Sequence, residues 1–344
     1  MAVLKVYENI IDSNIPIVDV RSPIEYHKAH ITHAYNVPLF SDSEREIVGT
    51  IYKNEGKEKA VLQGLKFVGN KLDSYVDHIK KITDSKKLIL HCWRGGKRSS
   101  SMAWLLELFD YEIIIIQNGY KSYRNFVLKY LESVNLNLIV LGGKTGSGKT
   151  VILQELKNRG EQVIDLEKLA NHKGSAFGWI GESQQGSVEQ FENDLFFEIS
   201  KLDLTKRIWI ENESRSIGKI YIPNGIWKNM NQARLVHLDI DLSSRVENLL
   251  AIYKTENPED LIKSFDKIKK KLGHENFSKA VEFVETGQLV SAIEIALSYY
   301  DKCYNYDYNN SKNSQILTYS ASNQTAKSIS ENLIELINNY SSHE

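Results

Sequence analysis

Two segments of the sequence combine glycines with reactive or cationic side chains in the pattern of anion-holding loops. The first, His91–Ser99, reads HCWRGGKRS and contains one of the two cysteines of the chain. The second, Gly143–Thr150, reads GKTGSGKT. Each follows a short apolar run and precedes a stretch with helical periodicity. Both are therefore predicted to join a strand to a helix.

The first loop has the surroundings of a reactive thiolate. Gly95 and Gly96 allow the positive backbone angles with which the N–H groups of a turn converge on one point. A helix beginning near Ser99 adds the positive end of its dipole. Because cations and a helix N-terminus favour thiolate over thiol, Cys92 is predicted to be a catalytic nucleophile. The loop that would hold an anion, or the terminal chalcogen of a persulfide, comprises Trp93, Arg94, Gly95, Gly96, Lys97, Arg98 and Ser99.

The spacing of these residues does not decide which reaction the loop supports. HCWRGGKRS also satisfies the Cys-x5-Arg-Ser pattern of cysteine phosphatases, and a phosphate is held by the same physics as a persulfide. The other cysteine, Cys303, lies in DKCYNYDY without a glycine turn and is expected to be structural. Two cysteines exclude a disulfide framework and a zinc site built on several thiolates, and they favour a reducing, intracellular setting.

The second loop has the G-x4-G-K-[ST] pattern in its required context, after a strand and opening a helix. Its backbone N–H groups would wrap a diphosphate, Lys149 would bridge the terminal phosphates, and Thr150 would ligate Mg²⁺ if the ion binds. The pattern leaves the ligand open among ATP, GTP and other diphosphates. The predicted diphosphate-binding residues are Gly143, Lys144, Thr145, Gly146, Ser147, Gly148, Lys149 and Thr150.

Carboxylates at probable strand ends are candidate partners for the same ion. Asp165 lies in QVIDLE, and Glu211 and Glu213 lie in IWIENESR. Carboxylate oxygens are ligands that Mg²⁺ accepts. The alternative for each is an ordinary carboxylate that faces solvent.

Short β-branched runs alternate with helical stretches, which predicts parallel α/β architecture. The boundary is placed near Ser133–Asn135, which gives one domain over residues 1–133 and a second, with a helical C-terminal part, over residues 134–344. Expected strands are Ile17–Val20, Leu88–His91, Ile113–Ile116, Leu136–Leu141, Arg207–Ile210 and Arg234–Ile240. Expected helices are Ala60–Ile82, Ser99–Phe109, Asn125–Leu131, Thr150–Asn158, most of Leu242–Leu297, and Thr325–Ile337.

Charge and hydropathy limit the partners. The formal net charge is -1, so a nucleic acid would have to be held by a local basic patch. One candidate patch is a predicted helical face with Lys263, Lys267, Lys270 and Lys271, whose simpler interpretation is a solvated face. The N-terminus lacks the pattern of a signal peptide, and no apolar run reaches the length of a membrane span. A cytoplasmic location without membrane association is expected.

Motifs along almost the whole chain resemble the bacterial tRNA 2-selenouridine synthases, in which a rhodanese-like domain is fused to a P-loop NTPase-like domain. In the first half these are DVRSPIEY, AHITHAYNVPL, EIVGTIYKNEGKEKA, HCWRGGKRS and NGYKSYR. In the second half they are GGKTGSGKT, DLEKLANHKGSAFG, WIENESRSIG and YYDKCYNYDY, in the order of the family. Two turn positions depart from the pattern, since His33 and Asn118 stand where the family carries glycine.

The resemblance implies a two-step change at the wobble uridine of tRNA. A 2-thiouridine is S-geranylated with geranyl diphosphate, and the geranylthio group is then replaced by selenium from selenophosphate. It implies tRNA as partner, an enzyme that supplies selenophosphate, and no tightly bound cofactor. It also adds supporting residues from the shared motifs, namely Asp19, Arg21, His172, Ser175, Phe177 and Arg215. The first rival interpretation is a sulfurtransferase or phosphatase fused to an ATP-dependent kinase-like domain. The second is a non-catalytic RNA-binding or regulatory module with a vestigial rhodanese fold.

Overall fold

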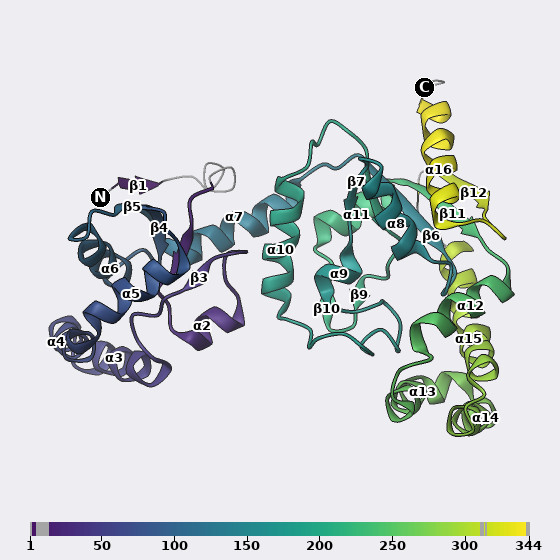
Figure 1. Cartoon of the computed structure of the whole chain (residues 1–344), viewed down its shortest axis with the longest axis horizontal. Helices are drawn as coiled ribbons and strands as arrows, with labels where there is room; N and C mark the ends of the chain where they lie inside the picture. Colours follow the sequence, from purple (N-terminus) through teal and green to yellow (C-terminus); the bar gives the residue numbers. More distant parts are fainter. Residues whose placement is uncertain (1, 5–13, 310–312, 314, 342–344) are drawn as a thin grey trace. The chain divides into compact units, whose positions relative to one another are not determined.

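The chain folds into two compact units, each built on its own parallel sheet (Figure 1). The computed structural model describes residues 2–4, 14–309, 313 and 315–341. The first unit comprises residues 1–131 and 187–200, and the second comprises residues 132–186 and 201–344. The α/β class predicted from the alternating runs is confirmed. The segment 187–200 joins the first unit although in sequence it lies inside the predicted second domain.

The first unit holds a five-stranded parallel sheet whose strands are short and apolar. Parallel sheets are covered on both faces, which explains why runs such as Ile113–Ile116 are continuously hydrophobic. In spatial order the strands are β1 (Ala2–Leu4), β5 (Glu112–Ile116), β4 (Lys87–His91), β2 (Ile17–Asp19) and β3 (Tyr35–Asn36). The strand β4, which leads into the Cys92 loop, therefore lies between β2 and β5.

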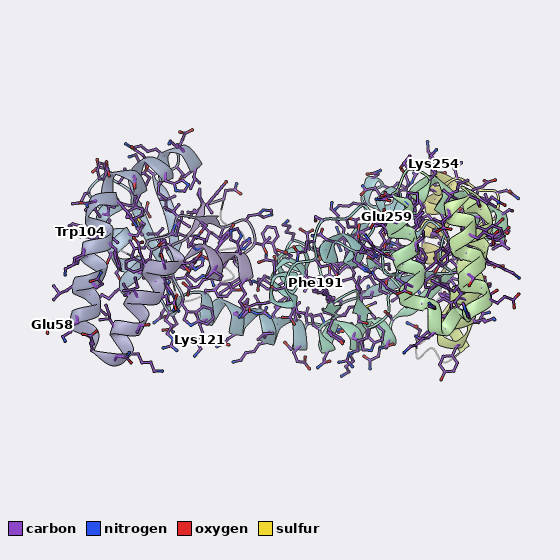
Figure 2. The ribbon with its side chains drawn as sticks, turned by 90° about the horizontal axis from the view of Figure 1, so that it is seen from below. Glu58, Trp104, Lys121, Phe191, Lys254 and Glu259 are labelled. Atoms are coloured by element: carbon purple, nitrogen blue, oxygen red, sulfur yellow. The ribbon has the colours of Figure 1, made fainter. Side chains whose placement is uncertain are left out.

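Helices cover this sheet and bury one main apolar core. Tyr75, Val76 and Ile79 belong to the core together with strand residues such as Leu88 and Leu90, whereas Trp104 lies at the surface with 58% of its side chain exposed (Figure 2). The helices are α2 (Pro23–Lys28), α3 (Asp42–Asn54), α4 (Lys57–Val68), α5 (Leu72–Ile82), α6 (Lys97–Glu107), α7 (Gly119–Ser133) and α10 (Val188–Ser200).

One expectation about these helices was wrong, and one helix was missed. A single helix was predicted over Ala60–Ile82, but a 3-10 turn at Gly69–Lys71 divides it into α4 and α5. The long apolar periodicity continued across this turn and hid it. The helix α3 was not predicted, although Ser41 and Glu44 form a capping box at its start. It packs against α4 (Figure 1).

The second unit repeats the plan with another five-stranded parallel sheet. The helices α8 (Lys149–Asn158) and α16 (Ala326–Ser341) share a core with the sheet that includes Leu141, Trp209 and Leu333. In spatial order the strands are β12 (Gln315–Ser320), β11 (Arg234–Asp239), β6 (Leu138–Gly143), β8 (Ile208–Glu211) and β7 (Gln162–Ile164). A two-stranded antiparallel sheet, β9 (Ser216–Ile217) with β10 (Ile220–Tyr221), and the helices α9 (Leu166–Ala170) and α11 (Asn224–Gln232) complete this part.

The C-terminal part of the second unit is mainly helical, as predicted. Its apolar core includes Phe177, Phe265, Ala280 and Ala296. The last helix of the group continues through the tyrosine-rich segment, beyond the predicted limit at Leu297. The helices are α12 (Leu242–Tyr253), α13 (Pro258–Leu272), α14 (His274–Glu285) and α15 (Leu289–Asn309). In the described ranges, no helix is long and apolar enough to cross a membrane.

Both glycine-rich loops lie where ligands bind in open parallel sheets. The strand β4 has neighbours on both sides, and so does β6. Ligands collect outside the carboxyl ends of such strands, where the connections lead to opposite sides of the sheet. The topology therefore places each loop at the favoured position of its own sheet.

Candidate functional site

The Cys92 loop directs backbone and hydroxyl donors at a buried sulfur. Cys92 follows β4 directly and is 3% exposed. The N–H of Gly96 donates to its Sγ at 3.3 Å, and the Ser99 Oγ lies 3.4 Å from it. Because α6 begins at Lys97, the positive end of its dipole faces the same region. This geometry suits a thiolate, and the role of Cys92 as nucleophile stays a prediction.

The backbone at the start of α7 packs directly against this loop and is hydrogen-bonded to it. Tyr120 N donates to the Cys92 carbonyl oxygen at 2.9 Å, and Lys121 N donates to the Trp93 carbonyl oxygen at 3.0 Å. The approach is so close that a Cβ added to Gly119, whose φ is +59°, would lie 2.2 Å from the Cys92 carbonyl oxygen. Asn118 also has a positive φ, +59°. Asn is one of the few residues besides glycine that adopt this left-handed conformation, so it fits the turn.

His33, the other position that departs from the family pattern, also has a left-handed backbone conformation. Its φ is +65°, and its ring packs edge-on against Phe197 of α10 with 4.8 Å between ring centroids. A left-handed residue with a large side chain is unusual. The contact with Phe197 gives the imidazole a packed position that a glycine would not fill.

One of the three cations in the Cys92 loop is neutralised by a carboxylate. Arg98 Nη1 donates to Glu25 Oε2 at 2.5 Å, and Arg98 Nη2 donates to Glu25 Oε1 at 3.3 Å. Burial disfavours ionisation of Glu25, but the hydrogen bonds from Arg98 outweigh it and lower the pKa of Glu25. Arg94 and Lys97 are exposed and can meet an incoming anion.

The predicted supporting residues Asp19 and Arg21 form a buried pair. Arg21 Nη2 donates to Asp19 Oδ2 at 2.6 Å and to the Ala29 carbonyl oxygen at 2.7 Å. His91, also fully buried, lies 3.8 Å from Asp19 Oδ2, and burial lowers the pKa of His91 to about 4. The imidazole is therefore neutral. Asp19 and Arg21 therefore form a buried ion pair, and their supporting role for the Cys92 loop stays a prediction.

The phosphate loop has the expected strand, turn and helix. Its glycines Gly143, Gly146 and Gly148 have φ values of +153°, +84° and +73°. The helix α8 begins at Lys149, and Lys149 Nζ donates to the Gly143 carbonyl oxygen at 3.1 Å. The lysine thus folds back over the loop, where it can reach a bound phosphate.

Helices far along the sequence hold the phosphate loop in place. Arg245 of α12 donates to the Thr145 carbonyl oxygen at 3.2 Å and to both carboxylate oxygens of Asp301 at 2.7 Å. Asn248 Nδ2 donates to the Gly146 carbonyl oxygen at 2.9 Å. These residues were not predicted, because nothing in the local sequence links positions about 100 residues apart.

Carboxyl groups gather beside Thr150 at the ends of β7 and β8. Thr150 Oγ1 donates to Glu167 Oε2 at 3.0 Å, and Glu167 N donates to Glu211 Oε1 at 2.7 Å. Glu213 shares a side-chain hydrogen bond with Glu167. Glu167 was missed, although it follows β7 closely. The predicted Asp165 instead caps α9, where its Oδ1 accepts from Lys168 N at 2.8 Å.

Burial raises the pKa of these carboxyl groups, so they hold their protons to a higher pH than exposed carboxyl groups do. It raises the pKa of Glu211 well above its ordinary value, with a further contribution from the charge of Asp165. Burial and the neighbouring Glu167 raise the pKa of Glu213 to about 8. In the described part of the chain, one oxygen of Glu211, Oε2, is buried without a hydrogen-bond partner. The cluster therefore has spare capacity for a proton or a cation.

These oxygens fit Mg²⁺ only as a partial ligand set. No group of three or more His, Cys, Asp and Glu side chains within the described ranges is arranged to hold an ion alone. Mg²⁺ is commonly bound by one or two carboxylates together with substrate phosphates. Thr150 and Glu167 would supply protein oxygens for an ion that a diphosphate brings, and Mg²⁺ stays a prediction.

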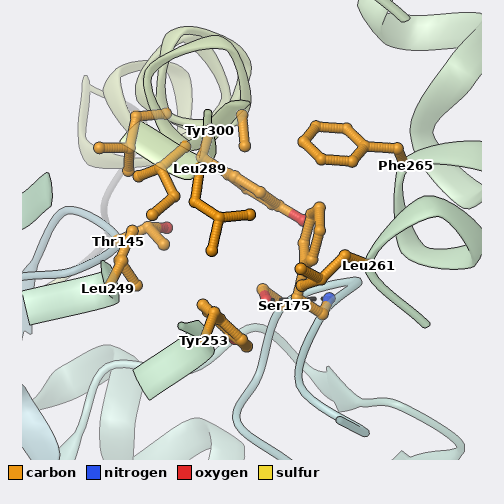
Figure 3. A pocket seen from close by; sticks show the side chains of 12 residues that line it. Thr145, Ser175, Leu249, Tyr253, Leu261, Phe265, Leu289 and Tyr300 are labelled. Carbon is orange, nitrogen blue, oxygen red and sulfur yellow. Dashed lines mark hydrogen bonds between the residues drawn. The ribbon is translucent and has the colours of Figure 1, made fainter. Parts of the chain in front are cut away.

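An apolar cavity adjoins the phosphate loop (Figure 3). Thr145 of the loop lines it together with the predicted candidates Ser175 and Phe177. The cavity volume is about 40 Å³. The other lining residues come from the helical C-terminal part and are mostly hydrocarbon, namely Leu249, Tyr253, Leu261, Phe265, Leu289, Ile293, Ala296, Leu297 and Tyr300. Sequence reasoning did not predict this cavity, because its wall is assembled from α12, α13 and α15.

The other two supporting candidates lie outside this cavity. His172 is 7% exposed, and its Nδ1 has no hydrogen-bond partner among the described residues. Arg215 is exposed and donates to Asn224. It lines a separate open groove of about 690 Å³ with Trp227 and Lys228.

The predicted tRNA-binding lysines lie on α13. Lys263 donates to Asp260 at 2.9 Å, and Lys267 Nζ lies 4.6 Å from the centre of the Trp179 ring. Lys270 and Lys271 are exposed. The opposite side of α13 carries Leu261 and Phe265, which line the apolar cavity. One helix thus presents cations to solvent and hydrocarbon to the cavity.

Comparison with known proteins matches both halves of the chain. Residues 3–126 match the model of the rhodanese-like domain, and residues 136–335 match that of the tRNA 2-selenouridine synthase AAA domain. The chain is 33% identical to a tRNA 2-selenouridine synthase of Sulfurovum sp. (strain NBC37-1), over 87% of this chain and 90% of that protein. It is 32% identical to the synthase of Hydrogenovibrio crunogenus, over 87% and 91%. For the synthase of Nitrosomonas europaea the identity is 34%, over 72% and 65%.

Proposed function

Because this chain belongs to the tRNA 2-selenouridine synthase family of tRNA-modifying transferases, we propose that it uses its two loops for two successive steps at one thiolated uridine. The phosphate loop holds geranyl diphosphate while the sulfur of 2-thiouridine attacks C1 of the geranyl group and diphosphate leaves. The Cys92 loop holds the selenium donor for the second step.

The apolar cavity beside Thr145 is the observation that carries the choice of geranyl diphosphate over a nucleotide. A prenyl diphosphate joins an anionic head to a hydrocarbon tail, and the loop and the cavity offer those two surroundings side by side. A nucleotide base would need polar partners to satisfy its donors and acceptors, and hydrocarbon walls leave such groups unpaired. The cavity volume of about 40 Å³ is smaller than that of a geranyl chain, so its leucine and phenylalanine side chains have to move apart to admit one.

The second step needs a site for a small, strongly anionic selenium donor. Selenophosphate carries its charge on a group that resembles phosphate, and the Cys92 loop offers exposed Arg94 and Lys97 with a helix N-terminus. Selenium of selenophosphate adds to C2 of the modified uridine and geranylthiolate leaves. The Cys92 thiolate then attacks phosphorus and breaks the P–Se bond, which leaves selenium on the uridine. Water releases phosphate from the resulting S-phosphocysteine and restores the thiol, so the sequence requires no oxidant or reductant.

The lysine face of α13 is the proposed contact for the tRNA phosphates. Lys267, Lys270 and Lys271 are candidates for neutralising them, since sequence-independent affinity for nucleic acid comes mainly from such contacts. Lys263 already pairs with Asp260 and is expected to contribute less.

The test is mass spectrometry of wobble nucleosides after reaction of purified protein with 2-thiouridine tRNA. Geranyl diphosphate alone should yield the geranylated nucleoside, and added selenophosphate should yield 2-selenouridine. Lys149→Ala should lose the first product, and Cys92→Ser should accumulate it. Retention of geranyl transfer in folded Lys149→Ala, or its dependence on ATP, would favour the kinase-like alternative. Full selenation by Cys92→Ser would remove Cys92 from the mechanism.

A further inference from the structure

The helix α10 brings a fully buried amide into the first unit. Asn193 is 0% exposed. Its Nδ2 donates to the His30 carbonyl oxygen at 2.8 Å and to the Tyr120 hydroxyl at 2.9 Å, and its Oδ1 accepts from Arg124 Nη1 at 3.1 Å. An amide in such a position is fixed, because any rotation leaves buried polar groups unpaired.

The Tyr120 hydroxyl is held from two sides by the same helix. It donates to Glu189 Oε1 at 2.8 Å while it accepts from Asn193. Glu189 and Asn193 are four residues apart and therefore lie on one face of α10. Together they use both the donor and an acceptor site of the hydroxyl, which fixes where the phenol ring points.

Tyr120 in turn contacts the Cys92 loop at two places and the buried Arg21 at a third. Its backbone N–H donates to the Cys92 carbonyl oxygen at 2.9 Å. Its ring centre lies 5.7 Å from that of Trp93. The guanidinium carbon of Arg21 lies 3.9 Å from the ring centre, in cation–π geometry. The position of Tyr120 thus affects Cys92, Trp93 and the buried Arg21.

We propose that Asn193 and Glu189 are positioning residues for the selenium step, acting through Tyr120 on the geometry of the Cys92 loop. The inference rests on the proposed function, in which Cys92 takes part in selenium transfer. It assigns part of the Cys92 site to a helix that the sequence places beyond the phosphate loop. A rhodanese-like segment cut at residue 133 would lack both side chains.

The experiment compares the two steps in the full-length protein. One assay follows geranyl transfer to 2-thiouridine tRNA, and the other follows single-turnover selenation of tRNA that is already geranylated. Asn193→Ala and Glu189→Ala should slow selenation about tenfold at saturating selenophosphate, with geranyl transfer within about twofold of wild type. Glu189→Gln keeps an oxygen that accepts from Tyr120 and should restore most of the rate. Val188→Ala, at an exposed position on the same helix, is the matched control.

A second readout follows the thiol itself. The rate of Cys92 alkylation by iodoacetamide should change in Glu189→Ala and stay near wild type in Glu189→Gln. The rate is measured on the proteolytic peptide that contains Cys92, which separates it from alkylation of Cys303. A purely packing role would lower the melting temperature and leave both selenation and alkylation of the folded protein unchanged. If Asn193→Ala does not fold, the Glu189 pair and Tyr120→Phe decide the matter.

The outcomes separate this inference from the proposed function. If Cys92→Ser still selenates, the proposed function fails irrespective of α10. If Cys92→Ser stalls while Glu189→Ala and Tyr120→Phe behave as Val188→Ala does, the positioning role is wrong and the proposed function stands.

Discussion

The Cys92 loop and the phosphate loop share a strand, a glycine turn and a helix N-terminus, but different neighbours complete them. The Cys92 loop is closed by the backbone of Gly119 and Tyr120, and its Arg98 is neutralised by Glu25. The phosphate loop is bordered by an apolar cavity and by carboxyl groups of raised pKa. The shared plan explains why both can hold anions. In the proposed function, these neighbours select the anion of each loop and allow a hydrocarbon tail to accompany it only at the phosphate loop.

The largest effect is expected where the backbone of the Cys92 loop is closest to its neighbour. Gly119→Ala places a Cβ 2.2 Å from the Cys92 carbonyl oxygen and 2.5 Å from Gly95 N, at a φ of +59°. The loop has to shift, and selenation should fall by about 100-fold or more while geranyl transfer persists. Single-turnover assays of the two steps measure this.

Gly69→Ala, in the turn between α4 and α5, is the matched control. Its φ is negative, and a Cβ there meets no described atom within 4 Å, so selenation should stay near the wild-type rate. Equal losses in both variants would show that the close approach at Gly119 has no special role. Equal losses of both reactions in Gly119→Ala would show that the two loops do not act separately.

The apolar cavity is the feature that sets the phosphate loop apart, and filling it should weaken the binding of the hydrocarbon tail. Ala296→Phe adds a ring to the cavity wall and should raise the KM for geranyl diphosphate about tenfold, since overfilled sites exclude their ligand. Ser298→Phe adds the same ring at an exposed position of α15 and should have little effect. Steady-state transfer kinetics provide the comparison, and equal KM values would argue against a tail in this cavity.

A smaller effect is expected from the lysines of α13, because each exposed charge contributes little alone. Replacing Lys267, Lys270 and Lys271 by Gln should make the negative slope of log K against log salt shallower, by roughly 0.7–0.9 for each phosphate that is no longer neutralised. Lys263→Gln should change it less, since Asp260 already pairs with Lys263. Filter binding of tRNA over a salt series measures the slope, and an unchanged slope in the triple variant would exclude this face.

The smallest expected effect concerns stability and the raised pKa of Glu213. Because the folded pKa is about 8 and the ordinary value is 4.5, folding favours the protonated carboxyl. That stabilisation is complete below pH 4.5 and is lost as pH rises to about 8. The wild-type melting temperature should therefore fall by several degrees more between pH 5 and 9 than that of Glu213→Gln, at roughly 2–4 °C per kcal/mol. Glu275→Gln, at an exposed position, should leave the wild-type pH dependence intact.

The local sequence was sufficient to predict the strand, turn and helix at each loop. The glycines and cations of each loop lie within ten residues, and the apolar runs before them could form buried parallel strands. The same locality placed Glu211 and Glu213 at a strand end. One carboxylate near Thr150 was assigned to the wrong residue. Asp165 was predicted, but it caps α9, and Glu167, two positions later, contacts Thr150 instead.

Contacts between distant segments could not be predicted in this way. The cavity wall joins Thr145 to helices that begin about 100 to 140 residues later, and Asn193 contacts His30 across 163 positions. Each of these residues is ordinary in its own segment. Only the folded chain distinguishes Ala296, in the cavity wall, from Ser298, exposed on the same helix, or identifies Asn193 as a buried support rather than a solvated amide.

The placement of α10 also affects how the protein is made. A ribosome that adds 5–20 residues per second needs roughly 3 to 14 s to extend the chain from Leu131 to Ser200. Until then the first unit lacks the helix that pairs with Tyr120, Arg124 and His30, and Phe196 is not yet available to cover Tyr123 and Tyr130. The nascent first unit is therefore expected to expose this tyrosine-rich surface to chaperones, and to complete its folding only while the phosphate-loop unit is being synthesised.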